Sequence, residues 1–494
     1  MPADLAVIGL GPFGLPLAQA AVAAGIPTLG YDCLPDPVAG TTTRSLHAPV
    51  PSRTGQESGG GRYADGVGGG DAGSPGAGSA AGAGGAGASG AGTGACGAGT
   101  GTGTGNGGTG ACATLTPADL RRIVSGGARP CPDPAQLGRV RTAVICVPTP
   151  PGPDGGPSLG QVAEAGRALA ARLRPHTTVI LESPVPPGTT EDFLRPLLED
   201  GSGLRAGRDF HLAYSPVRTD PGQGAPGYRA IPKVIGGLTP ACTESAAKFY
   251  GRLTEKVVRA RGPREAETVQ LLETNYRHVN IALVNEMAVL CHDLGVDIWD
   301  VIRCAETKPF GFHAFRPGPG VGGHTVPQHL PGRTAVVRPP GQGQGQGQGQ
   351  GLRTLRMVEL AQQVNHRMPQ YVVQRGAALL NEHGKSARGA HVLLLGVTYK
   401  PDMADRQGSP AEEIALRLME LGARVGYHDP YVPAWEVRGR AVPRADALYE
   451  GVAAADLTLL LQHHRTYDLQ GLSVKAQLLL DTRGATPAGA AERL

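Results

Sequence analysis

Residues 5–32 read LAVIGLGPFGLPLAQAAVAAGIPTLGYD, and this stretch decides the fold of the first part of the chain. Its apolar start predicts a buried strand, and the glycines and the alanine-rich run that follow predict a tight turn, a helix and a second strand. Gly9, Gly11 and Gly14 have the spacing GxGxxG between the first strand and the helix. In this context Gly9 makes the turn, Gly11 lets the backbone approach a pyrophosphate, and Gly14 lets helix and strand pack closely.

Asp32 ends the second predicted strand. Its carboxylate can accept hydrogen bonds from both ribose hydroxyls of a dinucleotide and would repel a 2′-phosphate. A GxGxxG spacing alone also occurs in glycine turns that are merely structural. Here strand, helix and acid all stand in the order that the fingerprint requires, and we therefore predict a site for NAD rather than NADP.

The alternation of strands and helices continues along the chain. Buried strands that end in turn residues are predicted at 142–150 and 177–190, and helical periodicity at 265–306 and 352–383. After residue 386 a second array follows in VLLLGVTYKP, PAEEIALRLMELGARVGYHDP and ADLTLLLQHH. We predict an α/β fold with two Rossmann-like, doubly wound domains joined by a helical central domain. The expected domains are residues 1–240, residues 241–385 and residues 386–494.

Two segments differ in composition from the rest. Residues 54–111 are almost entirely Gly, Ala, Ser and Thr, and residues 341–351 repeat Gly-Gln. Such sequences bury too little apolar surface to offset the entropy of ordering, so we expect disordered surface insertions without a function of their own.

Composition and charge exclude several classes of protein. The formal net charge is +4 with basic residues scattered along the chain, so we expect no nucleic-acid partner. The eight cysteines form no CxxC pair, and we expect neither a disulfide framework nor a metal site. There is no apolar run of the roughly 20 residues that cross a bilayer, and LAVIGLG follows the first residues directly. We expect a cytoplasmic protein without a membrane segment.

Further motifs make the sequence recognisable. They are VICVPTPP, LESPVPPGTTE, LAYSPVRTDPG, YRHVNIALVNEMAVLCHDLGVDIWDVI, TKPFGFHAFRPGPGVGGH, VLLLGVTYKPDM and YHDPYVP. Together with GLGPFGLPLA they resemble the UDP-glucose/GDP-mannose dehydrogenase family, most closely its UDP-N-acetylmannosamine-oxidising branch. The resemblance covers nearly all of the chain outside the two insertions. It implies an NAD-binding first domain, a central dimerisation domain and a C-terminal domain that binds a UDP-hexose type of nucleotide sugar.

The resemblance also implies a reaction, in which a sugar alcohol is oxidised to a carboxylate with two NAD through a cysteine thioester. The family's nucleophile follows GPGVGGH, where this chain has Thr325, and His329 replaces an acid of the next turn. Gln270 stands in place of the oxyanion-stabilising lysine, and Thr274 in place of an asparagine one turn later, with Asn275 next to it. A threonine hydroxyl is protonated near neutral pH and cannot form a thioester.

Three further positions depart from the family. Val217 replaces the glutamate of the SPER motif, Pro184 replaces a water-binding threonine, and Gln407 replaces an arginine that reaches the substrate. Losing one oxyanion donor alone typically costs about 10²–10³ in rate. We therefore expect the four-electron oxidation to be lost.

The binding apparatus implied by the resemblance is retained. It comprises Thr149 and Glu182 along the cofactor cleft, Gly320, Gly322 and Gly323 of the glycine loop, and Lys400 near the nucleotide sugar. Arg316 precedes the loop and can meet a diphosphate or stay solvated.

Several functions remain open at this point. His329 could remove a proton from an alcohol, which would allow a two-electron oxidation with one NAD, or it could simply face solvent. Cys291 and Cys304 lie on predicted helices and are expected to be small buried residues. A pseudoenzyme that binds NAD or a UDP-sugar as a regulatory or structural subunit is the alternative, and a decayed copy is a third. The resemblance also suggests polysaccharide biosynthesis, and a homodimer or a heterodimer with an active relative.

Overall fold

The computed structural model describes residues 3–11, 13–31, 129–130, 133–150, 152, 156–218, 228–323 and 355–494. Both predicted insertions lie outside these residues.

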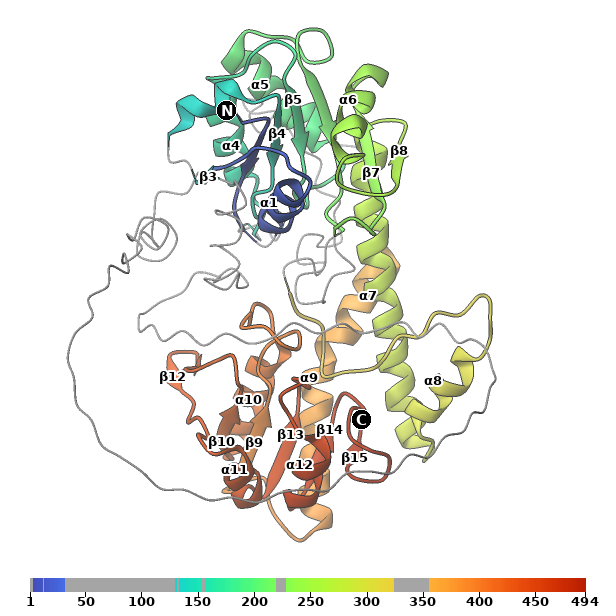
Figure 1. Cartoon of the computed structure of the whole chain (residues 1–494). Helices are drawn as coiled ribbons and strands as arrows, with labels where there is room; N and C mark the ends of the chain where they lie inside the picture. The colour runs from blue at the N-terminus through green and yellow to red at the C-terminus, as the bar shows by residue number, and fades with distance from the viewer. Residues whose placement is uncertain are drawn as a thin grey trace, which may run out of the picture. The chain divides into compact units, whose positions relative to one another are not determined.

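The first part of the chain forms an eight-stranded sheet with the order β3-β2-β1-β4-β5-β6-β7-β8 (Figure 1). Its strands are β1 Leu5–Ile8, β2 Thr28–Tyr31, β3 Arg129–Pro130, β4 Thr142–Ile145, β5 Thr178–Leu181, β6 His211–Tyr214, β7 Lys233–Gly237 and β8 Val257–Arg259. Neighbouring strands are parallel except β6 and β7. The order of the first six strands is that of the doubly wound dinucleotide-binding fold.

Helices alternate with these strands. They are α1 Gly14–Ala23, the 3₁₀ helix η1 Pro134–Arg139, α4 Gly160–Ala170, the π-helix η2 Thr189–Leu194, α5 Arg195–Ser202 and α6 Pro240–Tyr250. The first domain runs past the expected border at residue 240, because α6 packs on this sheet and β8 pairs in parallel with β7. Strand β8 has only three residues, largely exposed, so the sequence held no buried run to mark it.

The central strands bury both of their faces. Ala6 and Ile8 of β1 belong to one apolar cluster, whereas Leu5 and Val7 belong to another. Side chains alternate across a strand, so the two clusters lie on opposite faces of the sheet. This explains why the strands read as continuous apolar runs in the sequence.

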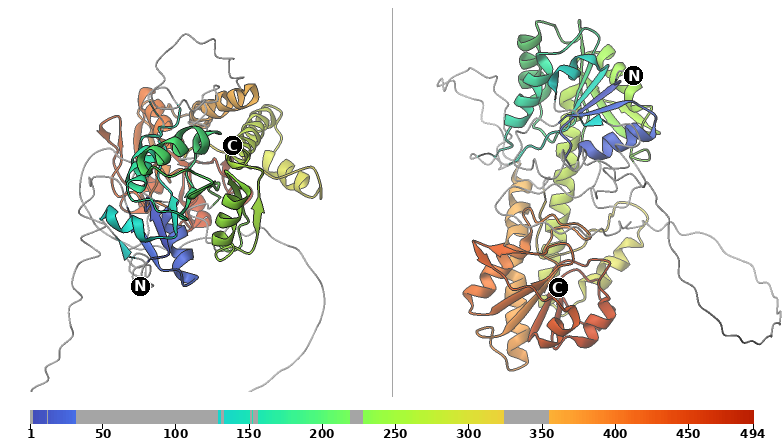
Figure 2. Two further views of the ribbon diagram at one scale, coloured as in Figure 1. Left: turned by 90° about the horizontal axis from the view of Figure 1, so that it is seen from above. Right: turned by 60° about the vertical axis from the view of Figure 1, so that its left-hand side comes forward.

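The described residues of the central part form the helices α7 Pro263–Asp293, α8 Ile298–Glu306 and α9 Arg356–Glu382. Helices α7 and α9 run side by side (Figures 1 and 2). Gly295 takes a left-handed conformation with φ +67° after α7, as the predicted helix end requires. Cys291 is buried against α8, but Cys304 is exposed, contrary to the expectation, because it lies on the outer face of α8 away from Ile302.

The C-terminal part forms a second parallel sheet with the order β10-β9-β13-β14-β15. Its elements are β9 His391–Leu395, α10 Pro410–Glu420, β10 Arg424–His428, β11 Glu436–Val437, β12 Arg440–Ala441, α11 Leu448–Ala454, β13 Leu457–Leu460, α12 Leu469–Lys475, β14 Leu479–Asp481 and β15 Glu492–Arg493. Strands β11 and β12 form a separate antiparallel pair. The α/β fold, with one mostly parallel sheet, one parallel sheet and a helical middle, confirms the predicted architecture. In the described part of the chain, no helix combines the length and the apolar character needed to cross a membrane.

Candidate functional site

The turn between β1 and α1 has the backbone that the predicted dinucleotide site requires. Gly9 has φ +96°, and a Cβ there would lie 2.8 Å from the carbonyl oxygen of Cys146. A Cβ at Gly14 would lie 1.9 Å from the Gly9 carbonyl oxygen, so only glycine lets α1 approach the turn. Among the described residues no side chain caps the N-terminus of α1. Its backbone N–H groups and positive dipole end can therefore receive a pyrophosphate.

The other predicted cofactor residues fall into two groups. Gly11 lies in the turn and its carbonyl oxygen accepts the N–H of Leu15. Thr149 follows β4, is buried, and donates its hydroxyl hydrogen to the carbonyl oxygen of Pro184 at 2.6 Å. It thereby ties together the loops that follow β4 and β5, next to the point where the strand order reverses. Asp32 lies outside the described residues.

Glu182 follows β5, but its carboxylate is buried within the first domain. It forms an ion pair with Lys233 and accepts hydrogen bonds from the hydroxyls of Tyr250 and Tyr228. Glu182 and Lys233 are 1% and 2% exposed. Burial, followed by the charge of Glu182, raises the pKa of both tyrosines. The carboxylate that was expected to line the cofactor cleft is thus fully engaged by protein groups.

Positions that the sequence resemblance assigns to the reaction centre meet at the end of β6. The Oε1 atom of Gln270 lies 2.6 Å from the Tyr214 hydroxyl and accepts the backbone N–H of Val217 at 3.4 Å. The same hydroxyl lies 3.1 Å from the carbonyl oxygen of Ser183, the residue before Pro184. Gln270 is 8% exposed. The structure therefore brings together three substituted positions that are far apart in the sequence, and all three side chains are neutral.

Beyond Gln270, the same face of α7 holds the start of the glycine loop. The N–H of Gly318 donates to Oδ1 of Asn285 at 2.9 Å, and Nδ2 of Asn285 donates to Oδ1 of Asn365 at 2.9 Å. Nδ2 of Asn365 in turn faces Nδ1 and the carbonyl oxygen of His278 at 3.4 and 3.3 Å. The N–H of Gly318 can only donate, so Oδ1 of Asn285 must face it and Nδ2 of Asn285 must face Asn365. This fixes the orientation of both asparagine side-chain amides. His278 must then accept at Nδ1 and carry its proton on Nε2.

This chain of hydrogen bonds ends in unused polar atoms. Nε2 of His278 and Oδ1 of Asn275 are buried and have no hydrogen-bond partner in the described part of the chain. Burial lowers the pKa of His278 to about 4, so the ring is neutral near pH 7. Positions 275 and 278 are neighbours on a helix surface. Together they offer one donor and one acceptor, a combination that a hydroxyl group or a water molecule satisfies. Thr274 lies on α7 between Gln270 and this pair, and its side chain is half-buried.

The glycine loop packs against the C-terminal domain. A Cβ at Gly322 would lie 2.5 Å from the carbonyl oxygen of Gly408, and one at Gly323 would lie 2.6 Å from the Tyr399 ring. Gly320 has φ +138° and lies against Pro410. The glycines are therefore required by close approach of protein to protein, in addition to any role toward a ligand.

The remaining predicted residues lie at both ends of this contact. Gln407 accepts the N–H of Gly323 at 2.9 Å through its carbonyl oxygen. Arg316 is exposed before the loop. The ammonium group of Lys400 lies 5.9 Å from the centre of the Tyr399 ring, and its carbonyl oxygen accepts the Thr398 hydroxyl. Thr325 and His329, the expected reaction residues, lie outside the described residues.

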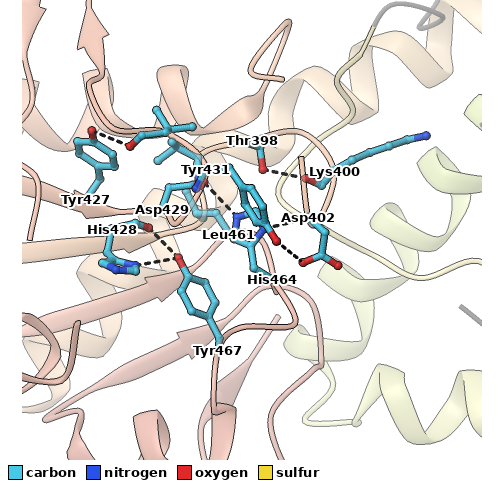
Figure 3. A network of polar contacts seen from close by, with 12 residues as sticks. Thr398, Lys400, Asp402, Tyr427, His428, Asp429, Tyr431, Leu461, His464 and Tyr467 are labelled. Atoms are coloured by element: carbon cyan, nitrogen blue, oxygen red, sulfur yellow. Dashed lines mark hydrogen bonds and ion pairs between the residues drawn. The ribbon is translucent and has the colours of Figure 1, made fainter. Parts of the chain in front are cut away.

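A polar network that the sequence did not indicate underlies the TYKPD turn (Figure 3). The N–H of Asp402 donates to Nδ1 of His464 at 2.9 Å, so the ring proton lies on Nε2 and donates to the buried Asp429 at 3.1 Å. The carboxylate of Asp402 accepts from Arg465 and from the Tyr431 hydroxyl. Asp402 has φ +62°. The network fixes the turn that carries Lys400.

Sequence reasoning missed Asn285, Asn365 and His278 because a polar residue on a predicted helix usually faces solvent. One signal was available for two of them: His278 and Asn285 fall eight and fifteen residues after Gln270, on the same face of α7. The partner Asn365 on α9 is 80 residues from Asn285 and had no such signal.

Taken together, a doubly wound first sheet with a GxGxxG turn and a second, parallel sheet define a dinucleotide-binding α/β protein with two Rossmann-like domains. Three family models match the chain. They are the NAD binding domain of the UDP-glucose/GDP-mannose dehydrogenase family over residues 135–254, its central domain over 264–335 and its UDP binding domain over 393–488.

Known proteins agree with this match. The UDP-N-acetyl-D-mannosamine dehydrogenase of Escherichia coli K12 is 31% identical over 356 residues, which are 69% of this chain and 80% of that protein. The enzyme of the same name from Pyrococcus horikoshii is 31% identical over 345 residues, 69% of this chain and 76% of that protein. A UDP-glucose dehydrogenase structure from Pyrobaculum islandicum has a TM-score of 0.72 at 24% identity, covering 100% of this chain and 97% of that one.

The chain belongs to the UDP-glucose/GDP-mannose dehydrogenase family. The expectation of NAD as cofactor is confirmed, and the UDP binding domain supports a nucleotide sugar as partner.

Proposed function

We propose that this chain binds NAD and a UDP-sugar and that any oxidation it performs removes two electrons from a sugar alcohol. The observation that carries this proposal is the environment of Gln270. Its neutral amide is held by Tyr214 and by the N–H of Val217, at positions where the family resemblance implies a cation and an acid. With Thr325 in place of the family's cysteine, the side chain at this position cannot carry a thioester.

The remaining chemistry balances without a covalent intermediate. The alcohol loses a hydride to NAD⁺ and a proton to a base, which gives a carbonyl compound, NADH and H⁺. We propose His329 as that base, since imidazole titrates near physiological pH. The proposed cofactor-binding residues are Gly9, Gly11, Gly14, Asp32 and Thr149, with Glu182 in support. The proposed substrate-binding residues are Arg316, Gly320, Gly322, Gly323 and Lys400.

A second candidate function is a binding subunit without turnover. The same Gln270 environment favours it, because a neutral amide stands where the resemblance implies a cation for the developing oxyanion. In this case the ligands are the same and only the hydride transfer is absent.

We propose three domains that follow the matches: an NAD-binding domain to about residue 260, a central helical domain to 385, and a nucleotide-sugar-binding domain over 386–494.

We further propose a dimer formed through α7, with a second copy as partner. Large apolar side chains are exposed along this helix at intervals of four, seven, four and three residues, namely Leu272, Tyr276, Leu283, Met287 and Leu290. Such a stripe is typical of a helix that packs against another helix.

The test combines NAD with a panel of UDP-sugars and follows NADH absorbance and thermal stability together. The proposal expects a stability increase with NAD and with a UDP-sugar, and at most one NADH per sugar. A stability increase without NADH supports the binding subunit. Two NADH per sugar with formation of a uronic acid would refute both. Thr325→Cys is the matched variant, and it should not restore the second NADH because Gln270 and Val217 are unchanged.

A further inference from the structure

A surface cavity lies in the first domain, at the edge of the sheet opposite the dinucleotide turn. It has a volume of about 550 Å³, opens to solvent and is lined by the residues at which three neighbouring strands begin, including Asp4 before β1, Thr142 of β4 and Thr178 of β5. The GxGxxG turn follows the other end of β1. Cavities of this size are typical of small-molecule sites.

The lining of this cavity is strongly basic. Its cationic residues are Arg139, Arg141, Arg174, Lys248 and Arg252, with His176 beside them and Asp4 as the single acid. Within the described residues, none of the five cations forms an ion pair or a side-chain hydrogen bond. Gathering positive charges without counter-charges costs self-repulsion, which a bound anion relieves.

Helix ends account for only part of this arrangement. Arg139 and Lys248 stand in the last turns of η1 and α6, where the helix dipole favours positive charge. Arg141 and Arg174 lie in loops before β4 and β5, and no helix end explains them. Three separate segments of the chain, around residues 139–141, 174 and 248–252, therefore bring their cations to one cavity.

Neutral donors complete the cavity. Thr178 is buried, and its hydroxyl lies 2.6 Å from that of Ser245, so the two together retain one hydrogen to donate. His176 has φ +67°, a conformation that non-glycine residues rarely adopt. It holds the loop between Arg174 and Thr178 in its sharp turn.

We propose that this cavity is a binding site for a multiply charged phosphate compound, distinct from the NAD and nucleotide-sugar sites. Arginine guanidinium groups bind phosphate oxygens in pairs, and four of the five cations are arginines. The common feature is a chain of two or more phosphates, which either an inorganic polyphosphate or a nucleoside triphosphate supplies. This inference is independent of the proposed function.

The test titrates inorganic tripolyphosphate into the full chain by calorimetry at about 0.15 M salt, with excess NAD and UDP present to occupy the other sites. The proposal expects binding to one site per chain. It expects Arg141→Ala with Arg252→Ala to weaken binding at least about tenfold, or roughly 1.4 kcal/mol. The matched control, Arg440→Ala with Lys475→Ala, removes the same charge from exposed positions of the C-terminal domain and should keep wild-type affinity.

Two outcomes would overturn the proposal: no saturable binding by the wild-type chain, or equal weakening in both double variants, which would indicate a general charge effect. All four substitutions change exposed side chains, and a thermal melt of each variant verifies folding. Repeating the titration with ATP separates the sources. Tighter binding of ATP than of tripolyphosphate identifies a nucleotide site, and equal affinity identifies a site for the phosphate chain alone.

Discussion

Glu267 offers the sharpest test of the energetics of this fold. It lies on α7 and is fully buried, where its carboxylate accepts hydrogen bonds from the N–H of Gly188 and from the N–H and hydroxyl of Thr190. Burial raises the pKa of Glu267 from 4.5 to about 7, although these hydrogen bonds act in the opposite direction. Glu267 thus joins α7 to the start of η2 at the cost of burying a carboxylate.

The sign of the effect follows from proton counting. Between pH 4.5 and about 7 the native state holds a proton on Glu267 that the unfolded state has released, so the free energy of unfolding falls as pH rises through this range. A shift of this size corresponds to roughly 3 kcal/mol at 1.36 kcal/mol per pKa unit. Glu267→Gln cannot titrate. The free energy of unfolding of this variant is lowered because the new amide N–H₂ faces a backbone donor. That loss is the same at every pH.

The assay measures urea unfolding of both chains between pH 4.5 and 8. The stability of the variant relative to wild type should rise by up to about 3 kcal/mol across this range. Glu265→Gln, which removes the same charge from an exposed position of the same helix, should show no such trend. Parallel curves for wild type and Glu267→Gln would refute the reasoning. A wild type that gains on the variant with rising pH would mean that the Gly188 and Thr190 donors outweigh burial.

Further predictions concern the loop, the helices and the substituted centre. Asn285→Ala leaves the N–H of the loop and an amide oxygen of α9 unpaired, and should lower the free energy of unfolding by about 2–4 kcal/mol in urea. Gly322→Ala places a methyl group 2.5 Å from a carbonyl oxygen and should cost about 1–3 kcal/mol in the same assay. Leu283→Glu on the exposed face of α7 should convert a dimer to a monomer in light scattering, and an unchanged mass would contradict the proposed interface. Gln270→Lys alone buries an unpaired cation and should destabilise by about 3–5 kcal/mol, whereas the double variant with Val217→Glu should recover part of that loss; strict additivity would contradict a direct contact.

Much of the fold could be predicted from local sequence because its signals are local. The strand-turn-helix at 5–32, the buried runs of β4 and β5, and the helix end at Gly295 all depend on residues close together in the chain. The three-residue strand β8 was missed because pairing with β7, rather than its own composition, creates it. Cys304 was misjudged for a similar reason, since its exposure depends on which face of α8 packs against α7.

The candidate site was predicted less completely because its side chains are organised by contacts between distant segments. Glu182 was expected to line the cofactor cleft, yet Lys233 and two tyrosines enclose its carboxylate. That environment depends on β7 and α6, which lie 51 and 68 residues further along the chain. The family motif could identify the position but not the direction in which the side chain points.

The contacts around Gln270 indicate that the departures from the family pattern form one coupled change. A lysine at this buried position needs a nearby negative charge, because an unpaired buried cation is strongly disfavoured. The backbone N–H of Val217 contacts the Gln270 amide, so position 217, where the family has its glutamate, adjoins position 270. With both charged groups replaced by neutral ones, Oε1 of Gln270 is contacted by the Tyr214 hydroxyl and the N–H of Val217. Replacing the acid alone would leave a cation at the buried position 270 without that partner. We propose that the neutral centre is a stable alternative arrangement and that, with Thr325 in place of the family's cysteine, it does not support the thioester reaction.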